Sequence, residues 1–229
     1  MTSRATIKMK KQSKKTANNL FDGERMKKKC LILSGSPKLG GNTAKLIKIF
    51  EENCDLDCET VYAYPLKGTK GISGCLDCGA CGKNKFCAVH DEFDKILKDD
   101  FDVFVIASPI FMSNLPGPMI NLVSRFNFDY NNHKQLQIKT NFKEKQGVLI
   151  LLGGGGACKP LQGQSNEDNP FRQAQFVFKK TNSILLKENV VLCLNADKQK
   201  VEENEEIIQK VKRIAQNVGR KKCDEMTLI

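Results

Sequence analysis

Several features that define common protein classes are missing from this chain of 229 residues. No stretch approaches the roughly 20 consecutive apolar residues that a membrane-spanning helix needs. The first residues, MTSRATIKMKKQSKK, include no apolar segment of the kind that a secretory signal carries. No internal repeat and no sign of a second domain are present. We therefore expect a soluble, cytoplasmic protein without a membrane partner, and its 40% hydrophobic content suffices for one core.

The net charge of +11 is unevenly distributed, and this argues against a nucleic-acid partner. Residues 1–29 hold ten Lys or Arg against two acidic residues, a balance of +8 that leaves only +3 for the rest of the chain. A basic binding face on the fold is therefore not expected. We predict that residues 1–27 form a basic, disordered leader and that residues 28–229 form the folded domain. A basic, acid-poor leader is also compatible with organelle import.

Short apolar runs alternate with amphipathic segments after the leader. The expected strands are residues 30–33, 60–64, 102–107, 146–152 and 190–194. The expected helices are residues 43–50 with Asn42 as N-cap, 91–98, a segment from Pro116 or Pro118 through Phe126, 171–186 and 203–218. This alternation predicts an α/β fold with a doubly wound parallel sheet covered on both faces. Five strands fit the flavodoxin-like order 2-1-3-4-5, with a cysteine-rich loop inserted at residues 74–90.

A ligand of such a sheet binds beyond the carboxyl ends of the strands, where the loops after Leu33, Ala107 and Leu152 would meet. The first loop is neither a Walker A motif nor a GxGxxG fingerprint. It instead places hydroxyl and amide side chains beside a helix N-terminus, which together can hold a terminal phosphate. Helix capping would explain Asn42 and Thr43 alone, but it would not explain the whole loop.

Four of the ten cysteines form a compact run, Cys75, Cys78, Cys81 and Cys87, with the spacing CxxCxxCxxxxxC. Such runs suit an iron–sulfur cluster, because one loop can supply several thiolates. The five-residue last gap differs from the two-cluster ferredoxin run, so all four would serve one cluster. Thiols without metal are an alternative, and zinc is another, although zinc ligands are usually split into two separated pairs. Cysteine-rich chains without a secretory signal belong in a reducing compartment.

The remaining histidines and cysteines are assigned no chemistry. We expect His90 to be a surface or capping residue and His133 to lie in a loop. The other cysteines are expected to be packed in strands (Cys30 and Cys193), incidental (Cys54, Cys58 and Cys223) or near the ligand without a role (Cys158).

Three segments carry a family resemblance: GSPKLGGNTAKL at 35–46, the cysteine run followed by His-Asp-Glu at 90–92, and SPIFMSNLPGPMINLVSRF at 108–126. Together they resemble the NADPH-dependent FMN reductase family of flavodoxin-like proteins and, within it, the iron–sulfur flavoprotein branch. The similarity runs from about Lys28 to the C-terminus. The chain departs from the family at Phe111, where Tyr is common, and at Ile120 and Ser124, where Lys and Asp are common.

The resemblance implies FMN and, through the iron–sulfur flavoprotein branch, a 4Fe-4S cluster on Cys75, Cys78, Cys81 and Cys87. It assigns the FMN phosphate to Ser34, Ser36, Lys38, Asn42 and Thr43. It assigns the isoalloxazine ring to Pro109, Ile110, Phe111, Met112, Ser113 and Asn114, and the ring edge to the loop that begins at Gly153 and Gly154. No protein acid or base is required, because the flavin carries the chemistry.

The resulting hypothesis is a flavin-dependent oxidoreductase that passes electrons between a reduced donor, ferredoxin or NAD(P)H, and small-molecule acceptors. One alternative is an NAD(P)H-dependent FMN or quinone reductase without a cluster. The other is a zinc-containing, non-enzymatic binding module. The resemblance also implies a homodimer or homotetramer.

Overall fold

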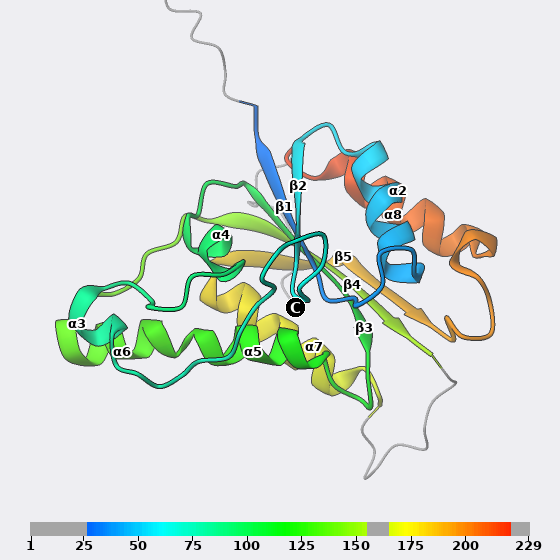
Figure 1. The fold of residues 1–229 in the computed structure, drawn as a ribbon. Helices are drawn as coiled ribbons and strands as arrows, with labels where there is room; N and C mark the ends of the chain where they lie inside the picture. Colours follow the sequence, from blue (N-terminus) through cyan, green and yellow to red (C-terminus); the bar gives the residue numbers. More distant parts are fainter. Residues whose placement is uncertain (1–26, 155–164, 221–229) are drawn as a thin grey trace, which may run out of the picture.

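The computed structural model of the chain describes residues 27–154 and 165–220, and these ranges contain one five-stranded sheet between two layers of helices (Figure 1). The strands are β1 (Lys29–Ser34), β2 (Asp57–Tyr62), β3 (Val103–Ile110), β4 (Lys145–Gly153) and β5 (Ser183–Leu194). Every pairing is parallel, and the order is β2-β1-β3-β4-β5. This confirms the predicted flavodoxin-like α/β fold. In the described ranges, no helix has the length and apolar character needed to cross a membrane.

The helices divide between the two faces of the sheet (Figure 1). One face is covered by α2 (Asn42–Asn53) and α8 (Glu205–Asn217), with the short 3-10 turn η2 (Val201–Glu203) before α8. The other face is covered by α4 (Phe93–Leu97), α5 (Gly117–Arg125) and α7 (Asp168–Lys180). The cysteine-rich segment contains α3 (Cys81–Asn84), which packs against α6 (Asn127–Leu136).

Side chains that point alternately to the two faces of the sheet form two hydrophobic cores, one on each face. In β1, Leu31 and Leu33 pack toward α4, α5 and α7, whereas Cys30 and Ile32 pack toward α2 and α8. Successive side chains of a strand point to opposite faces, so a strand buried on both sides must be apolar at nearly every position. For this reason β1, β3 and β4 could be recognised in the sequence as apolar runs.

The carboxyl ends of β1, β3 and β4 lie at one edge, as the switch-point argument predicted. The N–H of Gly35, just after β1, donates to the carbonyl of Ala107 in β3 at 2.8 Å. Ile110 at the end of β3 is paired with Gly153 at the end of β4. The three expected ligand loops therefore begin side by side.

The predicted helix at 171–186 is wrong in its second half. The helix α7 ends at Lys180, Asn182 adopts a positive φ of 51°, and β5 begins at Ser183. Ser183 and Ile184 pair with the start of β4, and a register shift between Gly147 and Leu149 carries the pairing onward. Leu185 and Leu186 suit a helix and a strand equally, and the sheet pairing decided between them.

Two smaller predictions are also wrong. Gly41, and not Asn42, is the N-cap of α2. His133 lies in α6 and not in a loop. The polar Asn-Asn-His-Lys stretch concealed this helix, which buries only Phe128 and Asn132 one turn apart. The leader proposed at 1–27 falls almost entirely outside the described residues.

Candidate functional site

The loop after β1 forms a polar cradle at the start of α2. Ser34, Ser36 and Thr43 are buried, while Lys38 is exposed. The hydroxyl of Ser36 accepts the N–H of Lys38 at 3.1 Å, which folds the loop back on itself. Gly41 caps α2 without any side-chain hydrogen bond, so no capping side chain occupies the N–H groups of the first turn. These N–H groups and the helix dipole favour an anion, which fits the phosphate assignment.

Asn42 makes a structural contact that the sequence did not predict. Its amide nitrogen donates to the carbonyl of Ala196 at 2.9 Å, and this ties α2 to the loop after β5. The N–H of Ala196 in turn donates to the carbonyl of Gly153 at 2.8 Å. The first and third ligand loops are therefore linked through one residue that sequence reasoning did not single out.

The loop after β3 makes a tight turn over residues 111–114. Phe111 and Asn114 exchange two backbone hydrogen bonds of 2.9 and 3.0 Å. The two central residues, Met112 and Ser113, have φ values of +50° and +59°, which non-glycine residues rarely adopt. Phe111 is 46% exposed and Met112 is 93% exposed. The turn thus holds two large apolar side chains outward at the carboxyl edge, where a planar ring could stack on them.

Polar side chains at the start of α7 hold this turn in place. The side-chain oxygen of Asn114 accepts hydrogen bonds from Asn169 at 2.7 Å and Gln173 at 3.2 Å. The hydroxyl of Ser113 donates to the side-chain oxygen of Asn166 at 2.6 Å. The sequence offered no signal for these three supports, because polar residues just before a helix or in its first two turns are usually solvent-exposed.

The loop after β4 begins with Gly153, which is buried, and Gly154, which is exposed. A Cβ at Gly153 would lie 3.2 Å from a methyl carbon of Leu194, and one at Gly154 would lie 3.4 Å from Asp197. A side chain at Gly153 would therefore press on the end of β5, whereas one at Gly154 would make an ordinary contact. Residues 155–164, including Cys158, are outside the described ranges.

The structure brings the four predicted cysteines together around one cavity of about 20 Å³, which is also lined by Arg125, Phe128 and Asn131. Cys75 and Cys78 are exposed, Cys87 is half-buried, and Cys81 is buried at the start of α3. A cavity of this size holds about one water molecule. In the parts of the chain that the structure describes, no three Cys, His, Asp or Glu side chains are arranged as metal ligands. The thiols would have to turn inward to share a cluster.

Hydrogen bonds to sulfur show that the donor set nevertheless fits such a group. The thiol of Cys75 accepts from the backbone N–H of Asp77 at 3.4 Å and from the Asn127 amide at 3.8 Å. The thiol of Cys81 accepts from the Asn131 amide at 3.5 Å. Donors of this kind stabilise thiolates and tune cluster potentials. Asn127 and Asn131 are four residues apart on α6, and sequence reasoning missed them because it overlooked that helix.

Ser124, one of the departures from the family pattern, contacts the cysteine loop directly. Its hydroxyl accepts the N–H of Cys75 at 3.0 Å and donates to the carbonyl of Asn121 at 2.7 Å. Ile120, the other departure on this helix, is partly exposed. His90 is exposed and lies 3.0 Å from the carboxylate of Asp94, which agrees with the predicted surface role.

A second thiol group, which was not expected, lies at the opposite edge of the sheet. Cys30 in β1 is paired in register with Cys58 in β2, and both Cys54 and Cys58 pack against the core that contains Cys30. Hydrogen bonds from the Cys30 and Cys58 thiols and from the backbone N–H of Leu56 lower the pKa of Cys54 to about 3. The bond with Cys30 lowers the pKa of Cys58, but the bond with Cys54 and burial outweigh it and raise the value to about 12. Their sequence spacing gave no sign of this convergence.

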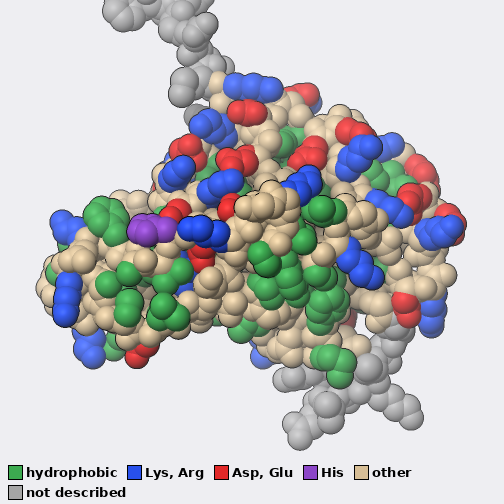
Figure 2. Space-filling view, viewed as in Figure 1, with side chains coloured by type: hydrophobic (Ala, Val, Ile, Leu, Met, Phe, Trp, Pro, Cys, Tyr) green, Lys and Arg blue, Asp and Glu red, His purple; other side chains and the backbone are tan. Residues whose placement is uncertain are grey.

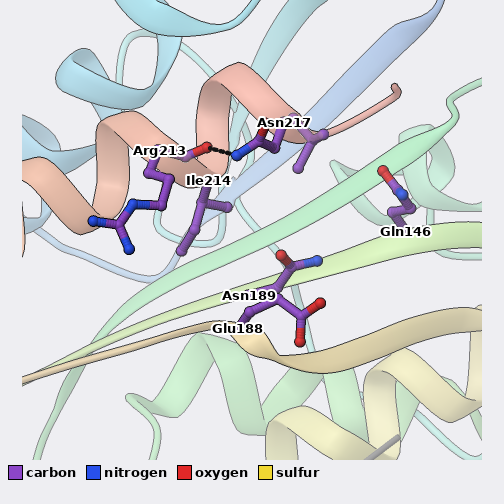
Figure 3. A pocket seen from close by; sticks show the side chains of 7 residues that line it. Gln146, Glu188, Asn189, Arg213, Ile214 and Asn217 are labelled. Carbon is purple, nitrogen blue, oxygen red and sulfur yellow. Dashed lines mark hydrogen bonds between the residues drawn. The ribbon is translucent and has the colours of Figure 1, made fainter. Parts of the chain in front are cut away.

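Figure 3 shows another hollow, of about 70 Å³, between α8 and the β4–β5 region. Part of its polar lining is bonded within the protein: Asn217 donates to the carbonyl of Arg213 at 2.8 Å, and Asn189 donates to that of Gly147 at 3.1 Å. The side chain of Gln146 accepts the N–H of Gly219 at 2.7 Å. Gln146 is near the amino end of β4, so this hollow lies away from the three ligand loops.

The chain is similar to known proteins in sequence and in fold. The chain is similar to iron-sulfur flavoproteins from Methanosarcina thermophila (29% identity over 141 residues) and Archaeoglobus fulgidus (25% over 143 residues). These alignments cover 57% and 60% of this chain and 67% and 60% of those proteins, so the chain spans about two thirds or less of their length. An azoreductase from Bacillus anthracis shares the fold, with a TM-score of 0.56 and 14% identity over 82% of this chain and 99% of that one.

The family comparison covers the segments that build the site. Residues 28–162 match the family described as NADPH-dependent FMN reductase. This segment includes β1 to β4, the polar cradle, the cysteine loop and the 111–114 turn. Because it makes up more than half of the chain, the chain belongs to the NADPH-dependent FMN reductase family of flavin oxidoreductases.

Proposed function

We propose that this chain binds FMN at the carboxyl edge of its sheet and transfers electrons from a reduced nicotinamide to small-molecule acceptors. Family membership supports the flavin and the nicotinamide donor. The observation that carries the proposal is the uncapped start of α2, next to the buried hydroxyls of Ser34 and Ser36 and the 111–114 turn. An anion site and an apolar stacking surface on adjacent strands match the two ends of FMN.

The residues of the chain would bind and orient the cofactor. The hydroxyls of Ser34, Ser36 and Thr43 and the first N–H groups of α2 would hold the phosphate, and Lys38 would add a positive charge. Asn42, the last residue assigned to the phosphate, would act mainly through its hydrogen bond to Ala196, which fixes the loop after β5. FMN supplies hydride and single-electron chemistry when bound, and its potential responds to hydrogen bonds at the ring edge.

The ring would lie against residues 109–114 and the backbone of Gly153 and Gly154. Stacking on Phe111 does not need the hydroxyl of the more common Tyr, so this departure removes one polar contact and keeps the surface. The hydrogen bonds from Asn169 and Gln173 to Asn114 hold the turn before any ligand arrives. A turn held in this way lowers the entropy cost of binding.

The finer proposal is that Cys75, Cys78, Cys81 and Cys87 hold one 4Fe-4S cluster, which exchanges single electrons with the flavin. Four sulfur donors around one cavity, three hydrogen bonds to sulfur and the iron-sulfur flavoproteins among the relatives support it. A cluster-free FMN or quinone reductase is the second candidate. It is favoured by the thiols, which are not arranged as metal ligands in the described conformation.

A protein electron donor such as ferredoxin is the alternative to the nicotinamide, and the surface around the cysteine loop favours it. Figure 2 shows hydrophobic side chains on the lobe that carries α3 and α6, besides a larger group over the middle of the molecule. Leu76, Phe86 and Tyr130 are 72%, 74% and 57% exposed there, and Lys83 and Lys85 are exposed beside them. An acidic protein carrier would complement this apolar and basic surface.

Composition of the purified protein tests the proposal. Anaerobically prepared protein should contain one FMN and about four iron and four sulfide per chain. Replacing Cys78 with Ser should remove the iron and keep the FMN, while replacing Cys58 with Ser, outside the loop, should keep both. FMN without iron would leave the cluster-free reductase, and zinc without flavin would refute the oxidoreductase proposal in favour of a binding module.

A further inference from the structure

A buried ion pair stands at the base of the cysteine loop. Arg125, the last residue of α5, and Asp91, which follows the loop, are joined at 2.8 Å, and their side chains are 1% and 2% exposed. The guanidinium also lies over the ring of Phe93, 4.7 Å from its centre. A buried charge pair is costly to desolvate and is a weak device for stability alone. Its position suggests a more specific use.

The pair closes the loop by bonding to both of its ends. On the near side, Arg125 Nη1 donates to the carbonyl of Ser73 at 3.2 Å, and the Asp91 carboxylate accepts the N–H of the same residue at 2.8 Å. On the far side, Arg125 Nη2 donates to the carbonyl of Val89 at 2.8 Å. Ser73 is two residues before the first cysteine of the run, and Val89 is two residues after the last. The two side chains thus fix the span across which all four thiols are presented.

The same arginine also contacts the cysteine cavity. Arg125 lines the cavity together with the four cysteines. The Nε atom of Arg125 is buried and has no hydrogen-bond partner among the described residues, whereas both Nη atoms of the same side chain have partners. A buried donor normally has an acceptor. An acceptor bound in the cavity, such as a thiolate or sulfide, would complete the set.

We propose that Arg125 and Asp91 are positioning residues for the metal site: a clasp that holds the ends of the cysteine loop so that four thiolates converge on one metal centre. This inference rests on the proposed cluster function of the loop. The planar fork of arginine is required, because one nitrogen bonds to Ser73 while the other bonds to Val89. Fixing the loop ends in advance reduces the chain entropy that metal binding must overcome.

Arg125→Lys tests the clasp with little change in charge. Lysine can still pair with Asp91, but it cannot bond to both loop ends in the geometry of the fork. We expect FMN content to stay at the wild-type level, while affinity for the metal, measured by competition with a chelator, falls about 10- to 100-fold, the usual effect of losing an outer support of a metal site. Lys145→Met is the matched control. Lys145 is also buried and bonds to backbone carbonyls, but its partners are Lys143, Thr181 and Asp99, outside the cysteine loop.

Binding of Co²⁺ to the reduced, iron-free protein separates this inference from the cluster proposal. Four thiolates give cobalt a strong sulfur charge-transfer band, and we expect Arg125→Lys to weaken cobalt binding at least about tenfold while Lys145→Met does not. If Arg125→Lys fails to fold, Asp91→Asn provides the same comparison. Wild-type protein that binds cobalt but no iron would refute only the cluster. Equal metal retention by wild type and Arg125→Lys would refute the clasp, as would a wild type that binds neither metal.

Discussion

A substitution at Gly35 gives the sharpest test of how the polar cradle, the proposed site of the FMN phosphate, is built. A Cβ at this position would lie 2.4 Å from the Ser108 hydroxyl oxygen and 2.9 Å from both the Ser108 Cβ and the Met119 side chain. Both neighbours are fully buried, so they have little room to move. Overpacking of this kind costs about 1 to 3 kcal/mol. Gly35→Ala should therefore lower the melting temperature of the FMN-free protein by about 3 to 9 °C, at roughly 3 °C per kcal/mol for a chain of this size.

FMN binding should suffer as well, because Gly35 is followed directly by Ser36 and carries the 2.8 Å bond from the first loop to Ala107. We expect the dissociation constant for FMN, measured by fluorescence quenching, to rise about tenfold, which corresponds to about 1.4 kcal/mol. Gly40→Ala in the same loop is the matched control, because its Cβ would meet nothing within 4 Å. Adding Ser108→Gly to Gly35→Ala removes the two closest Ser108 atoms and should restore part of both losses. If Gly35→Ala and Gly40→Ala behave alike, the close approach of β1 and β3 does not shape the cradle.

The other predictions concern the thiols, the ring turn and the leader. Because its pKa is lowered, Cys54 should be a thiolate between pH 5 and 8. The rate of its alkylation by iodoacetamide, followed by peptide mass spectrometry, should therefore be nearly independent of pH. Cys58, whose pKa is raised, should react slowly over the same range. A rate at Cys54 that climbs tenfold per pH unit would contradict this assignment. Asn114→Ala removes two hydrogen bonds from α7 and one to the carbonyl of Met112 within the turn, and it should cost about 1 to 2 kcal/mol of stability, seen in urea unfolding. It should also weaken FMN binding about fivefold; unchanged FMN affinity would count against the ring assignment. Removing residues 1–26 should leave the FMN content and the melting temperature unchanged, because the described cores begin at Cys30, and a large drop in either would show that the leader belongs to the domain.

The fold was predictable because its three central strands, β1, β3 and β4, are buried on both faces. Runs such as residues 102–107 are apolar at almost every position, and the alternation with helices fixes a parallel sheet whose carboxyl edge holds the ligand loops. The prediction failed where local sequence permits two structures. Leu185 and Leu186 fit a helix as well as a strand, and the polar residues 127–136 show only one buried stripe.

The sequence could indicate which residues form the candidate site, but not the contacts that hold them. Spacing singled out the four cysteines, and the hydroxyl and amide residues after β1 led to the prediction of a phosphate site, which stays a prediction. The contacts that hold these groups join residues far apart in the chain, such as Arg125 with Ser73 or Asn114 with Asn169. The spacing of residues in a single sequence does not show which distant residues are in contact. For the same reason, the sequence did not show that Cys30, Cys54 and Cys58 lie close together.

One helix links the two candidate sites. α5 begins just after the 111–114 turn, and its Met119 is the side chain that lies closest to Gly35 beneath the polar cradle, apart from Ser108. Further along, the amide of Asn121 donates to the carbonyl of Ile72 at 3.1 Å, and Ser124 accepts the N–H of Cys75. The helix ends at Arg125, the cation of the clasp.

Nine helical residues span about 13 Å, so α5 is a rigid spacer of that length between the ring turn and the base of the cysteine loop. A hydrogen-bonded helix varies far less in length than a loop of nine residues. The separation between the proposed ring site and the cysteines is therefore set by a packed helix, although the cysteines themselves lie on an irregular segment. Under the proposed function, this arrangement would keep the cysteine loop at a constant distance from the flavin, because the loop is fixed at its ends to the same helix that follows the ring turn.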